Sequence, residues 1–190
     1  MGTVTSSGGV FTVTDASGKS RQVDLGTLMM MLNLDRTENL DKQIAIQLDE
    51  IQKRNGTIKT LTEVLAKCRS LKAAGSNDDY QDANGGWHGQ SLTINGVAKP
   101  IWTSTSDAAG SSWADELGIS WNTGNEVNGG RPSDKDGASK WDAQWDAKIN
   151  EIKGKIDMLN NDSQMDNIKL QNLLEKRGNA FEMATKVMDT

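Results

Sequence analysis

The stretch that decides the fold is residues 44–65, which read IAIQLDEIQKRNGTIKTLTEVL. An isoleucine or leucine recurs in it every seven residues, at Ile44, Ile51, Ile58 and Leu65. Further apolar residues lie three or four positions from this series: Leu40, Leu48, Leu61 and Cys68. A stripe of this width is typical of a coiled-coil seam and is narrower than the apolar face of a helix in a globular core. We therefore predict a long helix over residues 25–75.

The pair Asn55-Gly56 is the weak point of this helix. A glycine in the middle of a helix costs ~1 kcal/mol relative to alanine, and Asn-Gly is also a turn signal. The seven-residue spacing nevertheless continues unchanged from Ile51 to Ile58. We therefore expect one continuous helix, ending at Gly75.

A second helix is expected over residues 139–190. Ser139, with Asp142 three residues on, resembles a capping box. Two seven-residue apolar series follow, and their first members are Trp145, Ile149, Ile152, Ile156 and Leu159. At about 1.5 Å rise per residue the two helices have nearly equal lengths, and each narrow stripe needs another narrow stripe to cover it. The predicted fold is mainly α, a long antiparallel coiled-coil hairpin.

The end of the second helix carries an additional apolar stripe. Leu174, Phe181 and Met188 are again seven residues apart, but they lie beside the main seam. A helix that faces one partner does not need two stripes. Either the N-terminal residues and Met29-Met-Met-Leu32 cover this stripe, or another subunit does.

The segments outside the helices are polar and rich in glycine. Residues 1–24 contain a short β-hairpin signal, Val10–Thr14 and Lys19–Val23 around the loop Asp15-Ala-Ser-Gly18. Residues 76–138 are expected to form a small α+β insert at the tip of the hairpin. It contains the type I′ turn signal Asn95-Gly96 and a short capped helix from Ser112 to Gly118. Its predicted core is Trp102, Trp113 and Trp121.

Composition and motifs exclude several functions. The net charge is −5, with basic residues scattered among acids, so nucleic-acid binding is not expected. No catalytic motif is present, and neither Cys68 nor His88 has a local partner for catalysis or metal binding. The fragment Asp134-Lys-Asp136-Gly137 lacks the first Asp and the final Glu of a calcium loop. We expect a non-enzymatic protein with no cofactor.

The sequence also predicts neither a membrane span nor a cleaved signal peptide. No run approaches the roughly 20 apolar residues of a membrane span. The first ten residues have no basic region followed by an apolar one, so any export is expected to use a signal that is not cleaved.

The arrangement of these segments resembles the needle-tip proteins, or hydrophilic translocators, of bacterial type III secretion systems, including their tip filaments. The likeness lies in a polar N-terminus, a long coiled-coil helix, a mixed insert and a C-terminal helix. It is carried by residues 164–183, QMDNIKLQNLLEKRGNAFEM, and by the preceding connector, residues 158–166, MLNNDSQMD. It covers about two thirds of the chain, and the insert matches no family pattern.

The resemblance implies a secreted virulence protein at the distal end of the secretion needle, on the bacterial surface. Its implied partners are the needle subunit, the hydrophobic translocators and further copies of itself. The residues implied in assembly and needle contact are Leu170, Leu173, Leu174, Arg177, Phe181, Val187 and Met188. The chain lacks the large N-terminal domain of the bigger tip proteins, which leaves a separate cytosolic chaperone as an open alternative.

A carbohydrate-binding or adhesin-type module on a coiled-coil stalk is the alternative function. It rests on the insert, because all six tryptophans of the chain lie between Trp87 and Trp145. Ring faces exposed side by side would favour sugar binding, whereas rings packed inward would favour a structural role.

Overall fold

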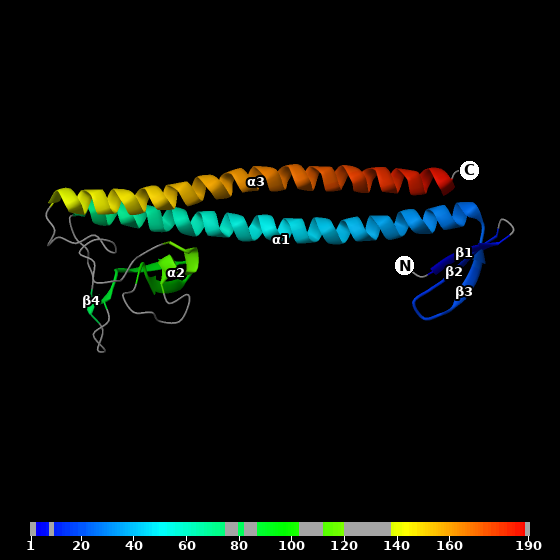
Figure 1. Ribbon diagram of the computed structural model, residues 1–190, viewed down its shortest axis with the longest axis horizontal. Helices are drawn as coiled ribbons and strands as arrows, with labels where there is room; N and C mark the ends of the chain where they lie inside the picture. Colours follow the sequence, from blue (N-terminus) through cyan, green and yellow to red (C-terminus); the bar gives the residue numbers. More distant parts are fainter. Residues whose placement is uncertain are drawn as a thin grey trace. The chain divides into compact units, whose positions relative to one another are not determined.

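The protein is mainly helical. The computed structural model describes residues 3–7, 10–74, 80–81, 87–102, 112–119 and 138–188. Two long helices, α1 (Leu25–Ala74) and α3 (Ala138–Met188), pack against each other, and they are the blue-to-cyan and yellow-to-red ribbons of Figure 1. The chain forms two compact units: unit 1 is Met1–Gln52 with Gln164–Thr190, and unit 2 is Lys53–Ser163.

Helix α1 begins at a capped terminus and continues without interruption. Thr27 donates a hydrogen bond from its backbone N–H to the Asp24 carboxylate at 2.7 Å, which satisfies one of the unpaired donors of the first turn. The bonds from Thr27 also lower the pKa of Asp24. Further along, the helix passes through Asn55 and Gly56, in agreement with the unbroken seven-residue spacing.

Unit 1 contains a three-stranded antiparallel sheet in the order β1-β2-β3. The expected hairpin is present as β2 (Val10–Thr14) and β3 (Ser20–Val23), and its loop is held by Asp15, which accepts hydrogen bonds from the backbone N–H groups of Ser17 and Lys19. Strand β1 (Thr3–Ser7) was not expected. It pairs with β2 from Thr3 opposite Thr14 to Ser7 opposite Val10.

Unit 2 holds the described part of the insert. Two short strands, β4 (Tyr80–Gln81) and β5 (Trp87–His88), form one antiparallel pair. Strands β6 (Ser91–Ile94) and β7 (Val97–Pro100) form a second. Their turn has φ of 52° at Asn95 and 81° at Gly96, as a type I′ turn requires. Helix α2 (Trp113–Leu117) starts at Ser112, whose hydroxyl accepts from the Asp115 N–H, and ends at Gly118 in the left-handed conformation.

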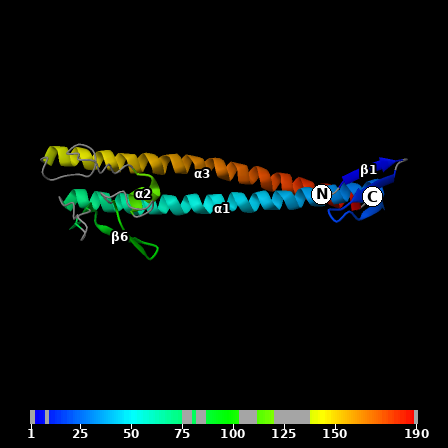
Figure 2. The same cartoon turned by 60° about the horizontal axis from the view of Figure 1, so that its bottom comes forward.

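One hydrophobic core joins the insert to both long helices. Helix α1 contributes Leu61, Val64, Leu65, Cys68 and Leu71; α3 contributes Trp145, Ile149 and Ile152; the insert contributes Ile94, Ile101, Trp102, Trp113, Ala114 and Ile119. Both Figure 1 and Figure 2 show the green segments with β6 and α2 beside the C-terminal part of α1. The sequence had suggested a core within the insert, but the described part of the insert shares its core with the helices.

Polar contacts hold the insert in the same place. Lys59 of α1 donates to the Asn95 side chain at 3.1 Å, which fixes the tip of the β6–β7 hairpin. Lys155 of α3 donates to the Gly118 carbonyl at 2.5 Å, where the last carbonyls of α2 need donors. The indole N–H of Trp113 donates to the Leu92 carbonyl at 2.8 Å, so the buried ring also has its polar group satisfied.

The shared core predicts a large cost for shortening Ile152, whose side chain is 0 % exposed. Replacement Ile152→Ala should lower the free energy of unfolding by roughly 2–5 kcal/mol, because it removes buried methyl groups and leaves a cavity. Denaturant unfolding measures this. The matched control is Met158→Ala on the same helix, which is 56 % exposed and should change stability by no more than about 0.5 kcal/mol.

The continuity of α1 predicts that Gly56→Ala stabilises the protein. A Cβ at Gly56 would meet no atom within 4 Å, and the residue lies inside the helix. Alanine should therefore raise the free energy of unfolding by about 0.5–1 kcal/mol. A loss of stability in Gly56→Ala would mean that the backbone breaks at this point.

Candidate assembly surface

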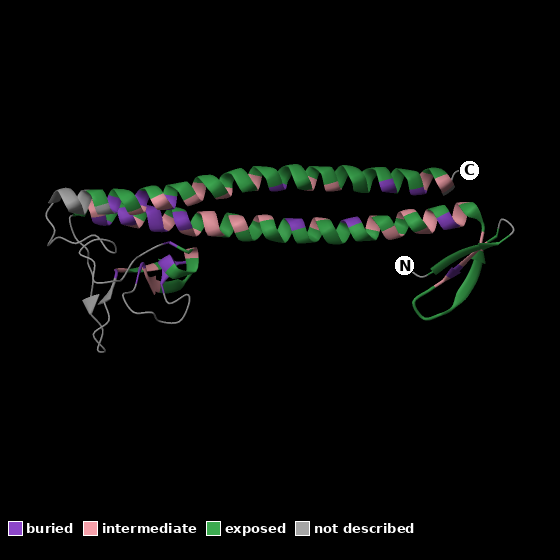
Figure 3. Cartoon of the chain, viewed as in Figure 1, coloured by how far each residue is buried: buried purple, intermediate pink, exposed green. Residues whose placement is uncertain are grey.

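The seam residues differ in burial between the two units. In unit 2, Leu65 on α1 and Trp145, Ile149 and Ile152 on α3 are buried. Ile58, Ile156 and Leu159 in unit 2, and Ile44 and Ile51 in unit 1, are half-buried. Leu48, which the spacing places beside the seam, is exposed. Figure 3 shows the same difference, with buried residues gathered in the C-terminal part of α1 and the N-terminal part of α3.

In unit 1, the off-seam stripe on α3 is exposed. Leu174 is 49 % and Phe181 is 60 % exposed, and of Met188 only the backbone is described. Leu170, Leu173 and Val187, which the resemblance groups with them, are half-buried. Helix α3 in unit 1 therefore uses one face within the chain and presents Leu174 and Phe181, the assembly stripe, to its surroundings.

Arg177 lies between the two members of the assembly stripe and contacts α1. Its guanidinium bonds to the carboxylate of Asp41. Both side chains are half-exposed, so this ion pair contributes little to stability, but it fixes which segment of α1 lies opposite this part of α3.

No described segment of unit 1 buries the assembly stripe. Met29 and Leu32 were expected to cover the stripe if the covering residues belonged to the same chain. Both side chains are themselves exposed. Unit 1 also exposes apolar side chains that the sequence analysis did not single out: Leu25, Leu34, Ile46, Met165, Ile168 and Met183.

Helix α1 also carries a second apolar stripe, and that stripe is buried. Val64 and Leu71 are seven residues apart and lie off the main seam, as Leu174 and Phe181 do on α3. They are 0 % and 4 % exposed, and they belong to the core that α1 shares with α3 and the insert. The sequence analysis missed this pair, although the same spacing rule would have found it.

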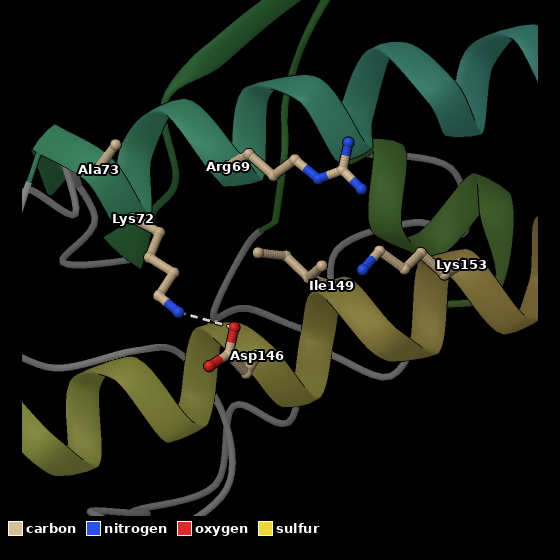
Figure 4. Close-up of a pocket in the computed structure, with 6 residues that line it drawn as sticks. All are labelled: Arg69, Lys72, Ala73, Asp146, Ile149 and Lys153. Carbon is tan, nitrogen blue, oxygen red and sulfur yellow. Dashed lines mark hydrogen bonds and ion pairs between the residues drawn. The ribbon is translucent and has the colours of Figure 1, made fainter.

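A second surface feature is an open groove in unit 2. It has a volume of about 430 Å³ and is lined by Arg69, Lys72, Ala73, Asp146, Ile149 and Lys153. Lys72 bonds to Asp146 at 2.7 Å, whereas the charged ends of Arg69 and Lys153 extend from α1 and α3 toward the same region, beside Ile149 (Figure 4). We call it the basic groove.

The remaining candidates from the sequence are the tryptophans and the possible metal ligands. Trp102 and Trp113 are buried in the core, as is Trp145, so these three rings present no sugar-stacking face. Trp121 and the side chains of Trp87 and His88 lie outside the described residues. Within the described ranges, His, Cys, Asp and Glu nowhere form a group of three that could hold a metal ion. Among the described helices, none has the length and apolar content to cross a membrane.

Neither a protein-family model, nor a curated protein, nor a solved structure matches this chain.

Cys68 is expected to be chemically inert in the native protein. Burial raises the pKa of its thiol to about 12, so the nucleophilic thiolate is not formed at neutral pH. A thiol reagent should modify it only after unfolding, and both Cys68→Ala and His88→Ala should keep biological activity. Loss of activity in folded His88→Ala would instead indicate a catalytic or metal-binding role.

Proposed function

We propose that this chain is a secreted, non-enzymatic needle-tip or tip-filament protein of a bacterial type III secretion system. It assembles on the needle and with further copies of itself through the C-terminal part of α3, and it presents the insert to host or translocator partners. It acts at the cell surface. The hydrophobic translocators and the needle subunit are its proposed partners.

The exposure of the assembly stripe is the observation that carries this proposal. Helix α3 has a seam that faces α1 and a second stripe, Leu174 and Phe181, that stays exposed in unit 1. The corresponding second stripe of α1, Val64 and Leu71, is buried in the core that α1 shares with α3 and the insert. The stripe on α3 has no such cover among the described residues, which supports a partner from another chain.

The contacts between the helices support an antiparallel coiled-coil hairpin with the insert at its tip. Within unit 1, α1 meets α3 near Gly26 and Val187 and again at Asp41 and Arg177. Positions later along α1 thus meet positions earlier along α3, as in an antiparallel pair.

The double variant Leu174→Ser/Phe181→Ser tests the assembly role. Burying a large apolar side chain stabilises an interface by roughly 1.5–3 kcal/mol, so removing two should weaken association about a hundredfold or more. Circular dichroism should remain that of the parent, because both side chains are exposed in the monomer. Sedimentation velocity and a needle-binding assay measure the effect.

The matched control is Val97→Ser/Met158→Ser. Both side chains are exposed and lie in unit 2, so the control removes similar apolar surface outside unit 1. It should assemble like the parent. Normal assembly of the Leu174/Phe181 variant would contradict the assembly role, and its outright unfolding would show that the stripe is part of the core.

Deletion of the gene tests the class of protein. In the bacterium that encodes it, deletion should leave the needle in place and block or deregulate delivery of the hydrophobic translocators. Unchanged translocator secretion and delivery would reject a needle-tip role and leave a self-assembling protein of another system.

A further inference from the structure

The basic groove carries charge that the chain itself does not neutralise. Of its three cations, Lys72 is bonded to Asp146, whereas Arg69 and Lys153 form no ion pair within the described ranges. Their charged ends approach the same region from α1 and α3, beside Ile149 (Figure 4). Two cations held in this way attract an anionic group, and their aliphatic chains accept an apolar group beside it.

The assembly stripe carries the complementary chemistry. Glu175 directly follows Leu174, and Glu182 directly follows Phe181. Both glutamates are exposed and have no ion-pair partner among the residues that the structure describes. Helix α3 therefore displays two pairs of an apolar and an acidic side chain, about 10.5 Å apart along its axis at 1.5 Å per residue. We call these four residues the α3 ridge.

We propose that the basic groove of one copy binds the α3 ridge of a second copy, with the charged ends of Arg69 and Lys153 contacting a glutamate and their aliphatic chains contacting the neighbouring apolar side chain. This inference rests on the proposed function and names the surface that receives the assembly stripe. A second copy fits better than an anionic polymer, because it offers an apolar side chain beside each carboxylate, whereas a polyanion offers charge alone.

The contact joins two different surfaces, because the groove belongs to unit 2 and the ridge to unit 1. Each copy can therefore receive one neighbour and bind another. Such a heterologous contact propagates from copy to copy and builds rings or filaments, whereas a two-fold contact stops at a dimer. Propagation is what a tip complex or a tip filament requires.

Charge reversal on each side tests the contact in the full-length chain. The groove variant is Arg69→Glu/Lys153→Glu, and the ridge variant is Glu175→Lys/Glu182→Lys. Each alone places like charges against each other, so self-association should weaken about tenfold or more while circular dichroism stays unchanged. Sedimentation velocity and light scattering measure the association.

Mixing the two variants provides the decisive measurement. In the mixture each reversed groove meets a reversed ridge, and each original groove meets an original ridge, so association should return to near the parental level. A single chain with all four substitutions should also associate. The control is Asp157→Lys/Asp162→Lys, which makes the same change of charge at exposed positions of α3 outside the ridge and should not weaken association.

The outcomes separate this inference from the proposed function. If Leu174→Ser/Phe181→Ser abolishes association but the charge variants associate normally, or if mixing restores nothing, the groove is not the receiving surface and the assembly role stands. Heparin binding that depends on Arg69 and Lys153, without rescue on mixing, would assign the groove to an anionic polysaccharide instead. A parent that stays monomeric, alone and with needle subunit, would contradict both proposals.

Discussion

The structure depends on covering narrow apolar stripes on two long helices. A helix that carries only a seam can be stable in water when one other helix covers it, and both α1 and α3 carry such a seam. Where the stripe widens, one partner is not enough. Leu61, Leu65 and Cys68 belong to the seam of α1. Val64 and Leu71 widen the apolar surface beside that seam, and all five residues lie in the core that also contains residues of the insert.

This requirement explains why the insert is built as it is. Its described strands are two to four residues long, and an isolated two-stranded hairpin of that size is marginally stable in water. Trp102, Trp113 and Ile101 become buried only because α1 and α3 supply the other half of the core. The insert is thereby fixed on the helices, and its position is set by apolar packing together with the bonds from Lys59 and Lys155.

The same logic links the fold to the proposed assembly. The second stripe of α1 is buried in the core of the chain, whereas no described residue buries the second stripe of α3. A protein that buries one stripe in its own core and the other against a further copy can fold as a monomer and still assemble. The acids beside Leu174 and Phe181 keep this exposed apolar surface soluble and, in our proposal, select the surface that receives it.

Much of the local structure could be predicted from the sequence. The seven-residue spacing predicted both long helices, Asn95-Gly96 predicted its turn, and Ser112 with Gly118 predicted the ends of α2, because each is specified by neighbouring residues. Strand β1 was missed, since the polar segment TVTSS has little apolar alternation and depends on pairing with β2.

For the candidate site, the sequence by itself determined the position of the assembly stripe, because heptad spacing places Leu174 and Phe181 on one face of α3. Only the tertiary structure decided that this stripe is exposed while Val64 and Leu71 are buried, because burial depends on what packs against a face and the two stripes have the same spacing. The basic groove was also decided by the tertiary structure. Arg69 and Lys153 are far apart in the sequence, and only the pairing of α1 with α3 brings their charges to one surface.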